Sequence, residues 1–425
     1  MLARPASRDA RIVLGLTALA LVARVVFVLS VDRVSFGFGD PAFYHAAASS
    51  LANGDGFLDL SGQPSARWPP VFPFVLAPFY ALFGSHATTG ELVNAVIGAA
   101  CVPLIFVLVR RVFGRREAFV AAALLALFPG QILYTDLLLA ETLFAFELLV
   151  FFVLLAILPI NWRSAALLGV VIGLAGLTRG EGIFLAVVVL AVWWPELAKP
   201  VLLRRLAVVG AGMVLVIAPW TVRNAIELDT FIPIANNSGA TLWAGHNPDA
   251  SGGVMYATPD FITVPQADEP GSPQAAIDQD RFLRDEALDF MVSNPLDELR
   301  LIPLKLVHLN RGDSRIVDIW INQVHPGDPK PVVGNALVAM SVVLDFAYYG
   351  LLALMIVAVV LLGRDGWRQR VLRGIFMLGI VSLVLYGFLF YGNPRYRAPL
   401  EPLMIVLVAP LLTRLWDARG RLLPA

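Results

Sequence analysis

The stretch FGFGDPAFYHAAASSLANGDGFL, residues 36–58, is the part of the sequence around which the rest is arranged. Its first half has the marks of a helix, because Asp40 suits the N-cap, Pro41 the first helical position and Gly54 the end. Asp40 and Tyr44 are four residues apart, so both side chains lie on one helix face. Asp40 therefore has two interpretations: it caps the helix, or it acts as an acid or base beside a phenol.

The composition is that of a polytopic membrane protein. Of 425 residues, 58% are hydrophobic and 15% are charged, and the mean hydropathy is +0.74, which excludes an ordinary soluble domain. The 32 basic and 32 acidic residues cancel, so no nucleic-acid partner is indicated. Cys101 is the only cysteine and the five histidines are scattered, so we expect no disulfide and no structural metal. The sequence leaves open whether a divalent cation joins the carboxylates.

Apolar segments of about 20 residues predict membrane spans. We expect ten of them, at roughly 12–30, 88–110, 117–133, 138–158, 165–178, 183–198, 204–222, 340–363, 371–391 and 398–415. No cleavage site follows the first, which we interpret as an uncleaved anchor. Two spans, 165–178 and 183–198, are short. Their connecting turn is therefore expected to lie below the membrane surface and to line a cavity within the protein.

The distribution of charge gives the orientation. The segments predicted to face the cytoplasm contain 18 Lys and Arg residues and five acidic ones. The positive-inside rule therefore places both termini in the cytoplasm and the long connections on the outer face.

Three regions follow from this topology. Residues 1–222 form an N-terminal transmembrane region whose first outer loop, 31–87, carries the opening helix and an interfacial helix near residues 68–83. Residues 223–331 form an extracytoplasmic region with short helices, one of them expected at about 274–292. The Leu-rich segment 296–309 is expected to lie on the membrane. Residues 332–425 form a C-terminal transmembrane region.

Four sets of polar residues meet at the predicted outer face. They are Asp40 with Tyr44 and His45; Glu141; Arg179 with Glu181; and the loop Asn393–Pro399, which contains Arg395, Tyr396 and Arg397. Glu141 lies in an apolar run, where an ionised carboxylate is costly. It belongs either to a site or to a structural pair with an arginine. Arg179 and Glu181 have the simpler interpretation of a mutual ion pair.

Arginines in the last outer loop oppose the positive-inside bias. The planar guanidinium suits a phosphate, and lipid phosphates lie at that depth. The alternative for Arg395 and Arg397 is a pair of arginines reaching to the membrane interface. Arg24, inside the first span, is a further buried cation that must face protein or water.

A resemblance rests on a series of motifs in a fixed order. After the arginine of the first span come D-x-x-x-Y with A-x-x-L-x-x-G-x-G-F, W-P-P-x-F-P, A-E-T-L-F, L-T-R, P-W-x-x-R-N with G-H-N-P, and P-R-Y-R-A-P-L-E-P. The chain resembles, from first span to last, the bacterial GT-C membrane glycosyltransferases related to dolichyl-phosphate-mannose protein mannosyltransferases and aminoarabinose transferases.

The resemblance implies an all-α GT-C-like bundle of about ten transmembrane helices with outer-face loops, in a bacterial inner membrane. It implies sugar transfer, with inversion, from a polyprenyl-phosphate-linked donor to an extracytoplasmic acceptor. Asp40 corresponds to the general base, Glu141 to the second acidic residue, and Arg395 and Arg397 to the group near the donor phosphate. The remaining candidate substrate-binding residues are Tyr44, His45, Arg24, Arg179, Arg223, Asn224 and Tyr396.

The alternative function is a transporter or flippase for lipids or lipid-linked sugars. Such proteins usually have repeated halves and bind substrate near the bilayer midplane. Here the halves do not match and the polar residues gather at one surface. No nucleotide is expected, because the sequence lacks a G-x-x-x-x-G-K-[ST] loop.

Overall fold

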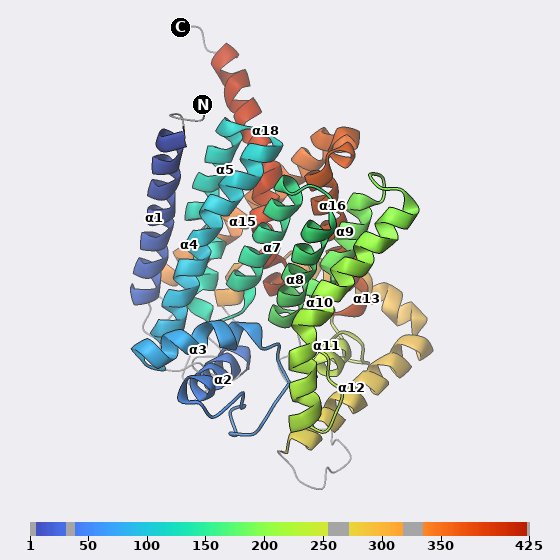
Figure 1. Cartoon of the computed structure of the whole chain (residues 1–425). Coiled ribbons are helices and arrows are strands. Elements are labelled where there is room, and N and C mark those ends of the chain that lie inside the picture. Colours follow the sequence, from blue (N-terminus) through green and yellow to red (C-terminus); the bar gives the residue numbers. More distant parts are fainter. Residues whose placement is uncertain (1–5, 31–38, 254–271, 318–334, 423–425) are drawn as a thin grey trace.

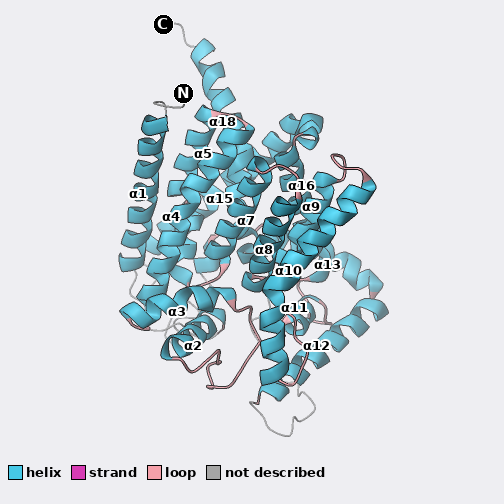
Figure 2. Cartoon of the chain, in the orientation of Figure 1, coloured by secondary structure: helices cyan, strands magenta, loops and turns pink. Residues whose placement is uncertain are grey.

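The computed structural model describes residues 6–30, 39–253, 272–317 and 335–422. In these ranges the secondary structure is helical, apart from two isolated bridges that pair Leu58 with Pro64 and Gly253 with Gly392 (Figure 2). In chain order the helices are α1 (Ala6–Ser30), α2 (Asp40–Asn53), α3 (Val71–Phe83), α4 (Ala87–Val112), α5 (Arg115–Leu127), α6 (Pro129–Leu133), η1 (Tyr134–Leu137), α7 (Glu141–Ile157), α8 (Trp162–Thr178), η2 (Gly180–Phe184), α9 (Leu185–Trp193), α10 (Lys199–Glu227), α11 (Ser238–Gly245), α12 (Pro273–Ser293), α13 (Pro295–Leu309), α15 (Asn335–Arg368), α16 (Arg370–Val384), η3 (Leu385–Leu389), α17 (Pro394–Arg397), η4 (Ala398–Leu400) and α18 (Glu401–Leu422).

The membrane-spanning character of the chain is confirmed by these helices. Six described helices are long and apolar enough to cross a bilayer, and a seventh span results if the bent pair α5 and α6–η1 counts as one. Each of the ten predicted spans coincides with a helix, but α7, α8 and α9 are shorter than this criterion requires. The number ten therefore stays a prediction.

The long helices form one bundle, and α2, α3, α11 and α12 cover one end of it (Figure 1). The start of α1 and the end of α18 lie at the opposite end. Close packing within the bundle depends on small residues, as in other membrane helices. At the contact of α8 with α10, a side-chain carbon added to Gly169 would lie 2.2 Å from the carbonyl oxygen of Val209. No residue larger than glycine fits there without separating the two helices.

At the end of the bundle that carries the termini, ion pairs connect basic residues of the predicted inside segments to carboxylates of other segments. Asp9 of α1 accepts from Arg110 at 2.8 Å and from Arg115 at 2.7 Å. Glu196 joins Arg370 and Arg373 in the same way. The predicted inside segments therefore contact one another across the bundle.

The predicted helices of the outer regions are confirmed. The opening helix is α2, and Gly54 adopts the left-handed conformation that ends it. The interfacial helix is α3, and α12 corresponds to the helix expected in the 223–331 region, whose Leu-rich segment forms α13. Ser272 caps α12 by accepting from the backbone N–H of Ala275.

The helix-cap interpretation of Asp40 is wrong. Gly39 occupies the N-cap position, and no side chain caps the first turn of α2. The carboxylate of Asp40 instead contacts two side-chain donors, which belong to the site described next.

Candidate active site

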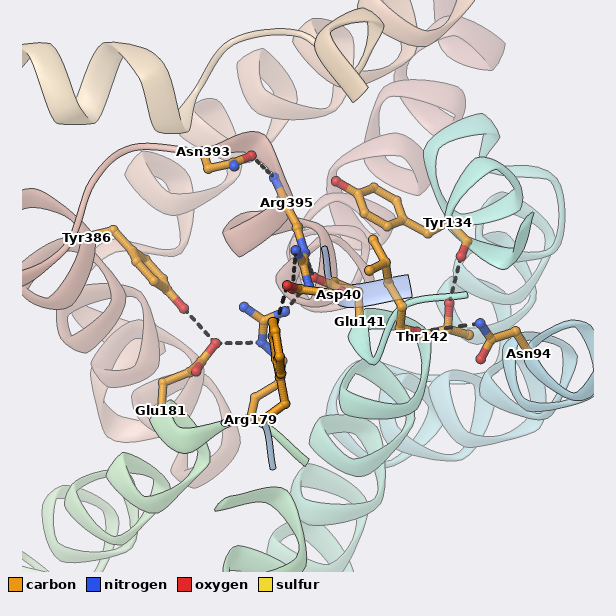
Figure 3. A network of polar contacts seen from close by, with 12 residues as sticks. Asp40, Asn94, Tyr134, Glu141, Thr142, Arg179, Glu181, Tyr386, Asn393 and Arg395 are labelled. Atoms are coloured by element: carbon orange, nitrogen blue, oxygen red, sulfur yellow. Dashed lines mark hydrogen bonds and ion pairs between the residues drawn. The ribbon is translucent and has the colours of Figure 1, made fainter. Parts of the chain in front are cut away.

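Arg395 is the centre of the polar cluster at the α2 end of the bundle. Its Nη1 lies 2.6 Å from Oδ2 of Asp40, and its Nε donates to Oε1 of Glu141 (Figure 3). The backbone N–H of Arg395 is held by the side chain of Asn393 at 3.0 Å. The start of α2, the start of α7 and the short helix α17 are thereby joined at a single guanidinium.

Arg179 supplies the second cation of the cluster. Its Nη1 lies 2.5 Å from Oε1 of Glu141, and its Nε lies 2.6 Å from Oε1 of Glu181. Tyr386 donates to the same Glu181 oxygen at 3.0 Å, and its ring stacks on Tyr396 at a centroid distance of 4.7 Å. The predicted Arg179–Glu181 pair is therefore confirmed, and it is part of a larger network.

Exposure distinguishes the two central carboxylates. The side chain of Asp40 is 25% exposed, whereas that of Glu141 is 2% exposed. A molecule entering from solvent can reach Asp40 but not Glu141. Glu141 instead fixes the positions of the two arginines, because a single carboxylate oxygen accepts from both.

Asp40 is held in its ionised form. Burial raises the pKa of this carboxyl, but the positive charge and hydrogen bond of Arg395 and the hydrogen bond from Trp68 outweigh it, so the pKa lies below its ordinary value. The indole Nε1 of Trp68 donates to Oδ1 at 2.9 Å. Asp40 is therefore a charged acceptor at neutral pH.

Tyr44 and His45 have different surroundings. Tyr44 is buried near Asp40, and burial together with that negative charge raises the pKa of its phenol, which stays protonated. His45 lies 2.9 Å from the hydroxyl of Tyr80 in α3. His45 therefore links α2 to α3, whereas Asp40 is the residue of α2 that pairs with Arg395.

Arg397 lies in a separate buried network. Its Nη2 lies 2.7 Å from Oδ1 of Asp313 and its Nη1 donates to Glu401, which also accepts from Gln131 at 3.0 Å. The guanidinium lies over the ring of Tyr348 at 3.2 Å. Two carboxylates thus neutralise Arg397, which shares no partner with Arg395.

Arg24 also lies apart from the cluster. It is 1% exposed and donates to the carbonyl oxygens of Ala126 and Leu125 at 3.1 and 3.4 Å. These carbonyls end α5, where Pro129 begins the next helix. The negative end of the helix dipole compensates the buried cation, so the bent α5–α6 pair accounts for Arg24.

Arg223 and Asn224 hold the first outer loop to α10. Arg223 donates to the carbonyl oxygens of Phe57 and Ser65, both at 2.8 Å. Asn224 is buried and donates to the carbonyl of Ile232 at 2.9 Å. In the described part of the chain, neither side chain forms a hydrogen bond with Asp40 or Arg395.

A groove lies between α15, α16 and α18. Its volume is about 630 Å³, and most of its lining is apolar. Asn310, Tyr348 and Arg397 provide polar groups in the lining, and the groove follows α15 from Tyr348 to Val359. At the rise of an α-helix this is a length of about 16 Å.

The sequence interpretation missed three partners of these residues. Trp68, in the W-P-P motif, holds Asp40, and Tyr386 holds Glu181. Glu401 follows Arg397 by four residues, a spacing that places both on one helix face and that predicts such a pair. In the described ranges, no group of three or more His, Cys, Asp or Glu side chains is arranged to hold a metal ion.

Comparison with protein families gives one match. Residues 67–222 match the family described as dolichyl-phosphate-mannose-protein mannosyltransferase. No curated protein sequence matches the chain.

Solved structures share the fold of the whole chain. The oligosaccharyltransferase of Archaeoglobus fulgidus, in a complex with zinc and sulfate, matches with a TM-score of 0.56 at 15% identity, over 96% of this chain and 49% of that one. The archaeal oligosaccharyltransferase AglB, with an inhibitory peptide and a dolichol-phosphate, matches with a TM-score of 0.54 at 14% identity, over 98% and 52%. ArnT from Cupriavidus metallidurans, bound to undecaprenyl phosphate, matches at 19% identity with a TM-score of 0.46, over 93% and 76%.

The chain spans about half the length of the oligosaccharyltransferases that it matches. The similarity shows a shared helical membrane fold, and the family match covers the helices from α3 to α10. Residues 67–222 therefore resemble the dolichyl-phosphate-mannose-protein mannosyltransferase family, and the chain as a whole shares the fold of the oligosaccharyltransferases.

Proposed function

We propose that this protein transfers a sugar from a polyprenyl-phosphate-linked donor to an acceptor at the outer face of a membrane. The observation that carries the proposal is the cluster in which Asp40 and Glu141 share the guanidinium of Arg395. It combines a reachable carboxylate with fixed cations, which are the two elements that displacement of a phosphate from a sugar requires.

Asp40 is the general base in this proposal. It is ionised at neutral pH and is the more exposed of the two central carboxylates. The acceptor hydroxyl or amine gives its proton to Asp40 as its oxygen or nitrogen forms a bond to the anomeric carbon. Attack from the face opposite the phosphate inverts the configuration at that carbon.

Arg395 and Arg179 stabilise the leaving group. The bond from the anomeric carbon to the phosphate oxygen breaks, and the polyprenyl phosphate leaves with the electron pair and the negative charge. Both arginines use Nε and Nη1 for protein carboxylates, and the Nη2 atoms have no bond to a described residue. These N–H groups are preorganised donors for phosphate oxygens. Arg397 has no such role, because its Nε, Nη1 and Nη2 all donate to protein acceptors.

The apolar groove supports a lipid-linked donor. It lies between membrane-spanning helices, and its lining suits a hydrocarbon chain. Because α17 and η4 connect Arg395 to the start of α18, the groove and the cations are close in the chain. A lipid in the groove would therefore have its phosphate near the cluster.

The proposed location is the inner membrane of a bacterium, with both termini in the cytoplasm and the cluster on the outer face. The excess of basic residues in the predicted inside segments supports this orientation.

The test is a transfer assay in liposomes with a matched variant. Purified protein receives polyprenyl-phosphate sugars and a membrane extract that supplies acceptors, and mass spectrometry detects sugar added to an acceptor. We expect donor-dependent product with the wild type and almost none with Asp40→Asn. Movement of the lipid between leaflets without product, equal in both proteins, would favour the flippase alternative and would contradict the proposal.

A further inference from the structure

A second group of buried ionisable side chains lies outside the proposed active site. His246 and Lys305 are both 0% exposed, and Glu298 of α13 lies beside them. Nδ1 of His246 is 2.8 Å from Oε2 of Glu298, and Nε2 is 3.1 Å from Nζ of Lys305. A carboxylate only accepts, so Nδ1 carries the hydrogen and donates to Glu298, which leaves Nε2 free to accept from the ammonium.

This group contacts the end of a helix that leads into the active site. Nζ of Lys305 lies 3.4 Å from the carbonyl oxygen of Phe388, and Nε2 of His246 lies 3.1 Å from that of Leu389. Both carbonyls are in the last turn of η3, where a helix has no internal partners for its oxygens. A cation at this end is also favoured by the helix dipole. Lys305 thus acts as a C-terminal cap supplied by another element, and Nε2 of His246 holds its ammonium in place by accepting from it.

The chain that follows the cap is clamped as well. The N–H of Gly392 donates to the carbonyl of Gly252 at 2.8 Å. A side-chain carbon added to Gly392 would lie 1.9 Å from the carbonyl oxygen of Lys305, so only glycine fits between the two. Asn393 follows directly, and its side chain holds the backbone of Arg395.

We propose that Lys305, His246 and Glu298 form a latch that fixes residues 388–392 and thereby positions Arg395 for the donor phosphate. The positioning of a donor-binding arginine rests on the proposed function, whereas the latch itself does not. None of the three side chains contacts Asp40, Glu141 or Arg395. They are therefore positioning residues, which act through the backbone that they hold.

The charges of the latch are balanced. The ammonium of Lys305 and the carboxylate of Glu298 cancel on either side of a neutral imidazole. Burial lowers the pKa of Lys305 to about 8, an effect that Glu298 opposes, and burial lowers the pKa of His246. Removing one member leaves the others buried and unpaired, which is the usual cause of large losses at such sites.

The first experiment measures the latch without any substrate. Hydrogen exchange of a peptide covering residues 386–395 is compared in the wild type, Lys305→Met and Asp280→Asn. Asp280 is a matched control, because it is buried and bonds the N–H of Ala240 but does not touch residues 386–395. We expect faster exchange of that peptide in Lys305→Met alone. Unchanged exchange in Lys305→Met would overturn the latch.

The second experiment tests whether the latch acts through Arg395. We expect Lys305→Met to raise the donor KM about tenfold in the wild-type background and less than about twofold in the Arg395→Lys background. Equal factors in both backgrounds would mean that Lys305 only supports the fold, and they would overturn the positioning role.

If Lys305→Met does not fold, variants of the partly exposed Glu298 provide a second test of the latch. Glu298→Gln keeps an acceptor for Nδ1 of His246 and should retain donor KM, whereas Glu298→Leu should raise it. Equal KM values for both variants would count against the latch. Absence of donor-dependent transfer in the wild type would instead refute the proposed function, and the exchange result would still decide the latch.

Discussion

Asp40 of α2 and Arg395 of α17 form an ion pair with an N–O distance of 2.6 Å. Arg395 also donates to Glu141, which is almost inaccessible, so one guanidinium lies between a reachable and an unreachable carboxylate. This arrangement assigns different roles to groups of the same chemistry. Asp40 can exchange its partner for a substrate, while Glu141 keeps the arginine in place.

The first prediction concerns Asp40→Asn. The amide oxygen still accepts from Trp68, and no helix cap is lost because Asp40 makes none. Stability should fall only by the contribution of the partly exposed ion pair with Arg395, whereas turnover should fall by about 10²–10⁴-fold, as is typical for loss of a general base. Single-turnover transfer and thermal melting of the purified variant measure the two effects. Turnover close to that of the wild type would exclude Asp40 as the base and direct attention to Glu141.

The second prediction separates the two arginines of the last outer loop. Arg395→Ala should weaken donor binding by about ten- to a hundredfold, because a charge-assisted contact with phosphate contributes about 1.5–3 kcal/mol. Arg397→Ala should instead destabilise the fold by about 3–5 kcal/mol, because it leaves Asp313 and Glu401 buried without their cation. Donor titration and thermal melting distinguish these outcomes. A stable Arg397→Ala protein with weak donor binding would contradict the assignment.

Local sequence patterns predicted the helices well, for a physical reason. The start and end signals of α2 and the Ser272 cap of α12 are encoded within a few residues of each element. The apolar lengths likewise require no knowledge of packing, and the membrane-spanning helices that they predict were confirmed. The orientation read from the basic segments stays a prediction.

Partners distant in the sequence could not be predicted in this way. The motif order suggested that Asp40, Glu141, Arg179 and Arg395 belong together. It did not predict that Arg395 and Arg397 lie in separate polar networks. That division depends on Asp313 and Glu401, whose positions are set by the packing of the loop after α13 against α18. The cap interpretation of Asp40 failed for the same reason: a distant arginine outcompeted the local backbone.

The third prediction uses the pKa of Asp40. Arg395 lowers this pKa, so the wild type should keep its turnover as the pH falls from neutral toward the ordinary pKa of 3.8. Arg395→Gln removes the main opposing charge, and burial then raises the pKa. The acid limb of the turnover profile should therefore move to higher pH in this variant. Arg163→Gln, which removes a cation in the first turn of α8, is the control and should leave the limb unchanged.

The same pair has a consequence for stability. Because the folded pKa of Asp40 lies below its unfolded value, ionised Asp40 stabilises the fold at neutral pH. That contribution is lost as the pH falls through the folded pKa. An acid limb at the same pH in the wild type and Arg395→Gln would show that Asp40 is not the titrating group.

The fourth prediction tests the orientation in the membrane. Single cysteines at Ser61 and Ala198, both exposed positions, are introduced after replacement of the buried Cys101 by alanine. In intact cells, a membrane-impermeant thiol reagent should label the cysteine at 61 and spare the one at 198, because the basic segments face the cytoplasm. Permeabilised cells serve as the control and should label both. Labelling of both positions in intact cells would refute the predicted topology.

The fifth prediction tests the groove between α15, α16 and α18. Gly379 lines it, and a side-chain carbon added there meets no heavy atom within 4 Å. Gly379→Trp should therefore be accommodated by the fold while its indole fills part of the groove. Binding of a long-chain polyprenyl-phosphate sugar should weaken by about tenfold, in line with the loss of about two buried methylene groups at about 0.8 kcal/mol each. Binding of a donor with a short, water-soluble chain should not change.

Gly350→Trp is the matched control for this substitution. Gly350 lies on α15, also has no heavy atom within 4 Å of an added side-chain carbon, and is not part of the groove lining. It should leave the affinity for both donors unchanged, which isolates the effect of the groove from that of a bulky residue in a membrane helix. If Gly379→Trp weakened the long and the short donor equally, the lipid would not lie in the groove. The donor phosphate would then have to approach Arg395 from another direction.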